Sequence, residues 1–443
     1  MDLVHALRLD LSTSPHFVVS LVGAGGKTTA LFRLARELLS TGIQRIFVTA
    51  TTHLGLWQIP LADHHIIARD ASDLNALPST GVILITGEVE NDRTRPVNEA
   101  VLNWLHEYSK GNSLPLLVEA DGSRQKPLKA PAEHEPPIPE FTDIVVHVSG
   151  LSALNQPLAE NVVHRAEKFS ALTGLLPGAK ITPGDLSKYL THPSGALKNF
   201  PRTAKRVALL NQADTPELLS ISGEMARELY GSYGSIIAGS LQTDELYQFE
   251  PTGAIVLAAG SSSRFGSPKQ LLDWHGKSFV RHVTETALRS GLEPVVVVTG
   301  FRHAEIESHL QGLPVSIVHN AEFETGQSSS IKAGIKSLPS NIGSVIFLLA
   351  DQPQIPVEVI RALRDSHTSE RHSILAPLVL EEKRANPVLF DKVTFPDLLQ
   401  LKGDIGGRGM FDKHKVSYMP WHDDILIFDV DTVEDYERLT GGE

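Results

Sequence analysis

The chain has 443 residues, of which 41% are hydrophobic and 21% charged, and these values predict two or three globular domains. The formal net charge of −12 argues against a nucleic-acid-binding protein, and the absence of cysteine excludes disulfides, thiolate metal sites and cysteine nucleophiles. We expect a cytoplasmic protein, because the sequence shows neither a signal peptide nor a run of about 18 apolar residues that would span a membrane.

Short apolar runs alternate with segments of helical periodicity along the chain. The runs are Phe17–Val22, Arg45–Val48, Val82–Ile85, Leu116–Val118, Ile144–Val148, Val207–Leu210, Ile255–Leu257, Val295–Val298, Val315–Val318, Val345–Leu349 and Ile425–Phe428. Several are rich in Val and Ile without polar alternation, which is typical of strands buried on both faces of a parallel sheet. The pattern predicts α/β architecture.

A glycine-rich segment follows the first run and leads into a predicted helix. Its backbone N–H groups, its lysine and its hydroxyls are suited to hold nucleotide phosphates and Mg²⁺, as in a P-loop. Leu21 stands where the usual P-loop has its first glycine, so a strand-to-helix turn without a ligand is the alternative. The residues expected to bind a nucleotide here are Gly23, Gly25, Gly26, Lys27, Thr28 and Thr29.

Two later segments of this half carry polar side chains at the ends of apolar runs. Glu119 and Asp121 follow Leu116–Val118 and, together with Thr28, are candidate ligands of a metal at the glycine-rich segment. Carboxylates at strand ends are also common as caps. Asn211 and Asp214 are similar in spacing to the base-binding motif of GTPases and are candidate nucleotide-binding residues, although simple loop residues are an equal alternative.

The region of about Phe17–Ile237 resembles the YqeC family, and its shortened glycine-rich loop resembles those of Mur-type ligases. The residues that carry the family resemblance are Gly23–Thr29, Thr49–Thr52, Glu119–Arg124, Lys126–Lys129, Pro131 and His134–Pro136. The resemblance implies a domain that binds ATP or GTP and assists maturation of selenium-dependent molybdenum hydroxylases. We expect His134 to be a solvated loop residue.

A polar segment, Ser240–Gly253, separates the two halves. We therefore expect an N-terminal P-loop-like α/β domain over residues 1–245 and a C-terminal, Rossmann-like domain over residues 251–443.

The second half begins with another strand followed by a segment of small residues. Small residues let the backbone approach a ligand, and Arg264 and Lys269 supply positive charge for a triphosphate. A solvated Gly/Ser-rich turn is the alternative. The candidate nucleotide-binding residues are Leu257, Ala258, Ala259, Gly260, Ser261, Ser262, Ser263, Gly300, Asn320 and Ser329.

The segment from Leu257 to Leu272 resembles the LAAGxSxRxGxxK signature of molybdenum cofactor nucleotidyltransferases, and most resembles the MocA-type cytidylyltransferases. Four further segments fit that family in order: Gly326–Ser330, Asn386–Phe390, Gly403–Arg408 and Asp429–Thr432. Gly407 and Val433 depart from the Ala and Pro of the family pattern. The resemblance covers nearly all of Ala254–Leu439.

The resemblance implies transfer of CMP from CTP to molybdopterin cofactor, with release of pyrophosphate. Arg264, Lys269 and Asp351 are the expected catalytic residues, with Asp351, Asp429 and Asp431 as candidate Mg²⁺ ligands. Positioning and electrostatics suffice for this chemistry, so no protein nucleophile is needed. An apo molybdenum hydroxylase is the implied protein partner. The alternatives are a guanylyltransferase, a sugar-phosphate nucleotidyltransferase, or a non-catalytic chaperone that carries the cofactor.

Overall fold

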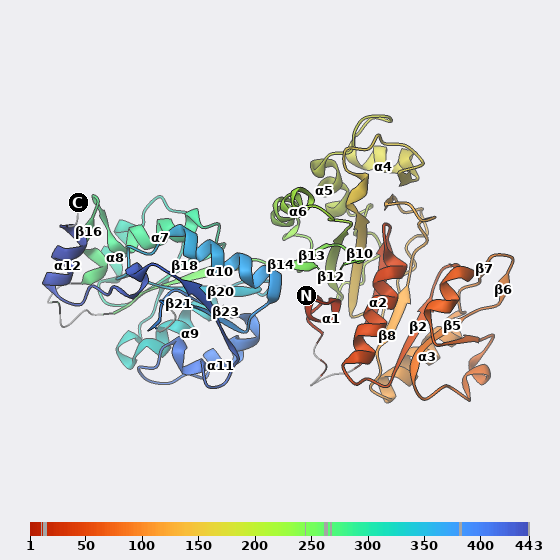
Figure 1. Cartoon of the computed structure of the whole chain (residues 1–443), viewed down its shortest axis with the longest axis horizontal. Coiled ribbons are helices and arrows are strands. Elements are labelled where there is room, and N and C mark those ends of the chain that lie inside the picture. Colours follow the sequence, from red (N-terminus) through yellow and green to blue (C-terminus); the bar gives the residue numbers. More distant parts are fainter. Residues whose placement is uncertain are drawn as a thin grey trace. The chain divides into compact units, whose positions relative to one another are not determined.

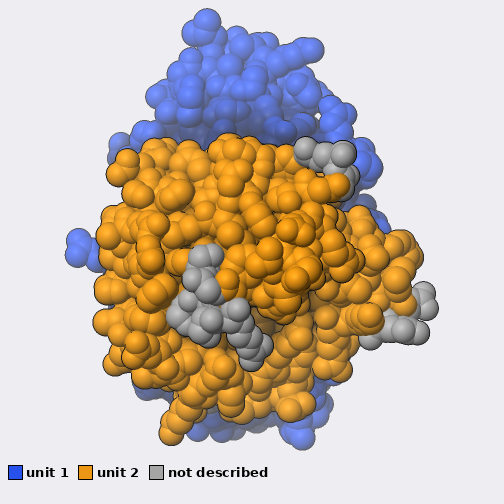
Figure 2. Space-filling view, turned by 90° about the vertical axis from the view of Figure 1, so that its left-hand side faces the viewer, with its two compact units in different colours: residues 1–249 blue, residues 250–443 orange. Residues whose placement is uncertain are grey.

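The computed structural model describes residues 1–9, 11, 16–243, 245–260, 265, 268–380 and 383–441. The chain divides into two compact units, Met1–Phe249 and Glu250–Glu443. Figure 1 labels their elements, and Figure 2 colours the first unit blue and the second orange. None of the described helices is long and apolar enough to cross a membrane.

The described part of the first unit is built on one large sheet with the strand order β14-β13-β12-β10-β1-β8-β2-β5-β4. All neighbouring strands are parallel except β13 and β14. The strands are β1 Val18–Gly23, β2 Arg45–Ala50, β4 His64–Ile67, β5 Gly81–Thr86, β8 Leu116–Glu119, β10 Ile144–Gly150, β12 Lys205–Asn211, β13 Ser235–Gly239 and β14 Leu246–Phe249. Two small sheets, β3-β7-β6 and β11-β9, comprise β3 Leu54–Gly55, β6 Val89–Glu90, β7 Arg93–Thr94, β9 Leu128–Lys129 and β11 Val163–His164.

Helices cover both faces of this sheet. Successive residues of a buried strand point to opposite faces, so each strand contributes side chains to a core on either side. Val19 and Leu21 pack in one core with Leu34 of α2, whereas Val18 packs in another core with Leu105 of α3. In α2, buried apolar residues recur every three or four positions, which places them on one face of the helix. The helices are α1 Leu3–Ala6, α2 Lys27–Ser40, α3 Glu99–Gly111, α4 Ala166–Thr173, α5 Pro183–Thr191 and α6 Pro216–Leu229.

The second unit contains a mixed sheet with the order β19-β18-β15-β20-β23-β21-β22, in which β24 also pairs with β21. Strands β19, β18, β15 and β20 are parallel neighbours, whereas β23 is antiparallel to both β20 and β21. The strands are β15 Thr252–Ala258, β18 Val295–Thr299, β19 Ser316–His319, β20 Ser344–Leu349, β21 Ile374–Val379, β22 Lys383–Arg384, β23 Val388–Asp391 and β24 Val416–Trp421, with a hairpin of β16 Asp273–Trp274 and β17 Lys277–Ser278.

Two cores flank this sheet as well. Val256 lies in one core with Val283 of α7, and Ile255 lies in the other with Ile331 of α9. The helices are α7 Phe279–Arg289, α8 His303–His309, α9 Gln327–Ser337, α10 Val357–Glu370, α11 Phe395–Leu398 and α12 Val433–Thr440. The two-domain α/β architecture, with a Rossmann-like second domain, is confirmed.

Two details of the expected fold are corrected. The run Ile425–Phe428 is not a strand: Asp424–Ile427 forms a 3₁₀ turn, because the Asp423 side chain accepts a hydrogen bond from the Ile425 N–H (2.9 Å) and caps it. The sheets are also mixed, since buried antiparallel strands such as β23 have the same continuous apolar composition as parallel ones.

Candidate functional site

The loop after β1 has a backbone conformation and close contacts that favour glycine. Gly25 and Gly26 have φ values of +75° and +127°. A Cβ on Gly25 would lie 2.4 Å from the Gly150 nitrogen, and one on Gly26 would lie 2.3 Å from Asn211 Nδ2. The loop leads directly into α2, whose first N–H groups have no intrahelical partner and face the side where an anion would bind.

Lys27 begins α2, and its side chain is almost completely buried. Its Nζ donates a hydrogen bond to Gly23 O at 2.9 Å. Burial lowers the pKa of Lys27, although the nearby carboxylates of Glu119 and Asp121 oppose that shift. A buried ammonium held beside its own loop is available for the outer phosphates of a nucleotide.

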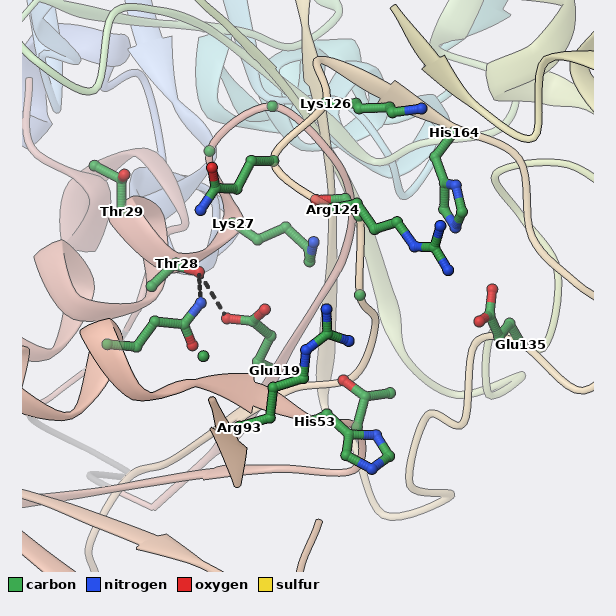
Figure 3. Close-up of a pocket in the computed structure, with 18 of the residues that line it drawn as sticks. Lys27, Thr28, Thr29, His53, Arg93, Glu119, Arg124, Lys126, Glu135 and His164 are labelled. Atoms are coloured by element: carbon green, nitrogen blue, oxygen red, sulfur yellow. Dashed lines mark hydrogen bonds between the residues drawn. The ribbon is translucent and has the colours of Figure 1, made fainter. Parts of the chain in front are cut away.

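Thr28 and Glu119 come together because β8 is the parallel neighbour of β1, with Leu21 in register with Glu119. Thr28 Oγ1 donates to Glu119 Oε2 at 3.0 Å and accepts from Gln58 Nε2 at 3.0 Å, shown by the dashed lines in Figure 3. Burial raises the pKa of Glu119, and Lys27 partly offsets this. A hydroxyl beside a carboxylate fits the oxygen donors that Mg²⁺ takes.

Asp121 has a different environment from Glu119. Its Oδ2 accepts from the Gly23 N–H at 3.2 Å, and its Oδ1 pairs with the Nζ of the buried Lys129. Lys129 also contacts Glu135 at 2.7 Å, and Glu135 binds the guanidinium of Arg165 through two hydrogen bonds of 2.8 and 3.0 Å. Asp121 therefore supports the glycine-rich loop through a buried ion-pair network.

A cavity of about 1140 Å³ opens beside the glycine-rich loop. Figure 3 shows Lys27, Arg93 and Arg124 directed into this space, with His164 beside Arg124. Its lining includes Gly25, Gly26, Lys27, Thr28, Thr29, Gln58, Arg93, Glu119, Arg124, Lys126, His134, Glu135, His164 and Arg165. His134 thus lies at the edge of a cavity as well as being exposed.

Asn211 lies at the end of β12, and both ends of its amide are engaged. Its Nδ2 donates to Gly25 O at 2.7 Å, and its Oδ1 accepts from the Leu241 N–H at 3.0 Å. Asp214 is exposed and is not part of the cavity lining. In this structure, Asn211 holds the glycine-rich loop in place and does not point into the cavity.

In the second unit, the candidate site lies at the carboxyl ends of β15 and β20. The chain leaves β15 toward β18 on one side and returns to β20 on the other, so these ends form a topological switch point. Asp351 follows β20, and Lys269 Nζ binds Asp431 Oδ1 at 2.6 Å. Gln352 Nε2 donates to Asp429 Oδ1 at 2.5 Å, which ties the C-terminal segment to this edge.

Burial raises the pKa of Asp351; Lys269 acts in the opposite direction, and Asp429 and Asp431 add to the increase. These four charged groups are therefore close enough to influence one another. Among the described residues, no three His, Asp or Glu side chains are already arranged around a common metal position. A bound Mg²⁺ would favour the ionised form of Asp351 among these carboxylates. Oxygen atoms of the substrate phosphates would supply the remaining ligands of the cation.

The remaining candidates of this unit fall into three groups. Ser261, Ser262, Ser263 and Arg264 lie outside the described residues. Asn320 donates to Ser329 (2.8 Å) and Ser330 and accepts from the Glu322 N–H, so it connects the end of β19 to α9. The Gly260 carbonyl oxygen accepts a hydrogen bond from Gln270 at 2.9 Å. Gly300 packs against Phe323 and Ala259, and Ala258 is buried.

Two adjoining cavities of about 470 and 310 Å³ flank this edge of the second unit. Asn386, Arg408 and Asp429 line both, and Leu257 lines the smaller one. The resemblance to nucleotidyltransferases had already marked the segments that hold these residues. By contrast, no motif marked Gln58, Arg93 or His164 in the first unit, because they come from separate short elements.

Comparison with known proteins gives a separate match for each unit. The sequence profile of the YqeC protein family matches residues 19–167, and that of the MobA-like NTP transferase domain matches residues 254–417. The uncharacterized protein YqeC of Escherichia coli (strain K12) is 34% identical over 232 residues, covering 51% of this chain and 87% of that protein. Nicotine blue oxidoreductase of Paenarthrobacter nicotinovorans is 31% identical over 198 residues, covering 42% of this chain and 94% of that protein. Purine catabolism protein PucB of Bacillus subtilis (strain 168) is 30% identical over 198 residues, with the same coverage of 42% and 94%.

Proposed function

Because the chain belongs to the YqeC family in its first unit and to the MobA-like nucleotidyltransferases in its second, we propose that it is a molybdenum cofactor cytidylyltransferase joined to a nucleotide-binding accessory domain. In this proposal the second unit transfers CMP from CTP to the phosphate of molybdopterin cofactor and releases pyrophosphate. The first unit binds ATP or GTP and acts with an apo molybdenum hydroxylase.

The observation that supports the transferase proposal most is the position of Lys269 and Asp351. Lys269 is buried and bound to Asp431 at the switch point of the sheet, beside the partly buried Asp351. The ammonium at that point can pair with the negative triphosphate of a nucleotide, and the carboxylate can bind the Mg²⁺ that accompanies it.

The reaction needs an in-line displacement at the α-phosphorus of CTP. A phosphate oxygen of the acceptor forms the new bond to that phosphorus, while the bond from phosphorus to the β-phosphate oxygen breaks and pyrophosphate leaves. Lys269 neutralises charge on the triphosphate, and Asp351 with Asp429 would hold Mg²⁺, which supplies further positive charge there. Asn386 and Arg408, which line the adjoining cavities, would bind the acceptor.

Pyrophosphate release tests this proposal directly. The purified chain with Mg²⁺ and molybdopterin cofactor is offered CTP, GTP, ATP and UTP in separate reactions. We expect release with CTP alone, its loss in Asp351→Ala, and its retention in Lys27→Ala, since Lys27 belongs to the first unit. Release with GTP instead would move the function to guanylyl transfer. No cofactor-dependent release with any nucleotide would favour a different acceptor or the carrier chaperone.

A further inference from the structure

One side of the cavity in the first unit is formed by three cations and a histidine that the nucleotide site does not use. These residues are Arg124, Lys126, His164 and Arg165, which we call the basic wall. Figure 3 shows Arg124, Lys126 and His164 across the cavity from Thr28 and Thr29. The basic wall adjoins the glycine-rich loop directly, because the Gly25 N–H donates to the Lys126 carbonyl oxygen at 3.0 Å.

The cavity is large for a pocket that binds one small ligand. Pockets that hold a single small molecule typically measure about 300–1,000 Å³. The cavity here measures about 1140 Å³, and the glycine-rich loop, Thr28 and Glu119 lie along one part of it. The basic wall lies along another part, where a second ligand can fit.

The charges of the basic wall are only partly compensated within the protein. Arg165 is bound to Glu135, and Lys126 contacts Glu160 at 3.3 Å. Arg124 is exposed in the cavity, and within the described ranges no side chain forms a hydrogen bond or ion pair with its guanidinium. In a chain with a net charge of −12, an arginine that faces a cavity without an acidic partner marks a place for an external anion.

His164 lies within the positive field of these side chains. Burial, together with the positive charges of Arg165, Lys129, Arg124 and Lys126, lowers the pKa of His164 to about 4. His164 is therefore neutral at physiological pH and can donate a hydrogen bond without adding to the repulsion among these cations. The backbone here is also unusual: Arg124, Gln125 and Arg165 all have φ values between 51° and 65°, which few non-glycine residues adopt.

We propose that the basic wall binds the phosphate group of a second, organic phosphate substrate at the same time as the glycine-rich loop binds its nucleotide. This inference rests on the nucleotide site proposed above for the first unit. The planar guanidinium of Arg124 binds the phosphate oxygens in a bidentate manner, with Lys126 and the neutral His164 beside it. The first unit is then a two-substrate site, with the second substrate held next to the outer phosphates of the nucleotide.

The test measures two ligands in the full-length protein. First, binding of a fluorescent ATP analogue with Mg²⁺ is measured for the wild type and for Lys27→Ala. Second, protein saturated with Mg²⁺ and ADP is titrated calorimetrically with ribose 5-phosphate and, separately, with inorganic phosphate. The same titrations are made with Arg124→Ala and with Arg202→Ala, which removes an exposed arginine that does not line the cavity. Any binding of phosphate to the second unit contributes equally to all of these proteins.

We expect Arg124→Ala to weaken ribose 5-phosphate binding about 10-fold or more, the loss expected for a charge-assisted hydrogen-bond pair. Arg202→Ala should leave the affinity for ribose 5-phosphate unchanged, and Arg124→Lys should retain part of it. The affinity for the nucleotide should stay within about 3-fold of wild type in all three variants. Weaker binding of inorganic phosphate than of ribose 5-phosphate would assign the wall to an organic ester.

Equal affinities of Arg124→Ala and Arg202→Ala would overturn the inference, as would binding of inorganic phosphate alone or displacement of the nucleotide by ribose 5-phosphate. Failure of the nucleotide site is a separate result, seen when Lys27→Ala binds the ATP analogue as the wild type does. The phosphate titrations repeated without nucleotide would still report on the wall in that case.

Discussion

The buried ion-pair network behind the glycine-rich loop makes the stability of the first unit depend on Lys129. The Lys129 side chain is 1% exposed and contacts Asp121 and Glu135, whose side chains are 5% and 16% exposed. Lys129→Met keeps a similar volume but removes the charge, so Asp121 is left as a buried carboxylate without its partner. Removing one partner of a buried pair typically costs about 3–5 kcal/mol.

We expect a value near the lower end, about 3 kcal/mol, because Glu135 keeps its two hydrogen bonds to Arg165. For a unit of this size, that loss lowers the melting temperature by roughly 6–12 °C. Differential scanning calorimetry of the full chain measures it, and Arg202→Ala, an exposed cation of the same unit, serves as a control.

A double-mutant cycle with Asp121→Asn shows whether the loss arises from the pair. The double variant Lys129→Met/Asp121→Asn should be clearly more stable than the sum of the single effects predicts. A drop below about 1 kcal/mol for Lys129→Met, or strict additivity in the cycle, would refute the reasoning.

The same network makes the stability of the first unit depend on pH in the acid range. Burial acts to raise the pKa of Glu135, but hydrogen bonds from Arg165 and Lys129 outweigh it and lower the pKa to about 2, from an ordinary 4.5. A carboxylate whose pKa is lowered by folding stabilises the folded state at pH values above its pKa in the unfolded chain. This stabilisation is lost as the pH falls toward the pKa of the folded state. The stability difference between wild type and Lys129→Met should therefore narrow as pH falls from 4.5 toward 2.

Three further predictions concern individual side chains. Asp351→Asn should abolish pyrophosphate release, because the amide lacks the negative charge that a proposed Mg²⁺ ligand supplies; an unchanged rate in Asp351→Asn would contradict a metal-binding role. Asn211→Ala leaves two backbone groups without their partner and should cost about 1–3 kcal/mol in chemical denaturation, whereas Asp214→Ala, an exposed neighbour, should be nearly neutral. Gly26→Ala forces a side chain into a backbone of φ +127° and should abolish binding of an ATP analogue while pyrophosphate release by the second unit continues; normal nucleotide binding would show that the loop can adapt.

Local sequence patterns predicted the architecture and the two families. The apolar runs at Phe17–Val22 and Val345–Leu349 correspond to β1 and β20, because continuous burial on both faces requires apolar residues at consecutive positions. Both resemblances are confirmed by the matches at residues 19–167 and 254–417. Glycines at 25 and 26 were informative for a local reason as well, since their positive φ values favour glycine.

Strand pairing was decided only by the tertiary structure. The antiparallel direction of β23, and the 3₁₀ turn at Asp424–Ile427 in place of a strand, depend on which neighbours each segment meets. An apolar run of four residues is compatible with either conformation, and in the folded chain the Asp423 side chain caps the 3₁₀ turn.

Some residues of the two candidate sites were predicted from the sequence, and others were found only in the structure. The sequence by itself determined where the glycine-rich loop and the nucleotidyltransferase signature lie, because their chemistry is encoded in consecutive residues. Only the folded chain showed that Gln58 meets Thr28, that Lys129 is buried between two carboxylates, and that Arg124 and His164 face one cavity. Gln58 and Thr28, and Arg124 and His164, are 30 or more positions apart in the sequence, and the burial of Lys129 depends on the surrounding fold, so no local pattern records these contacts.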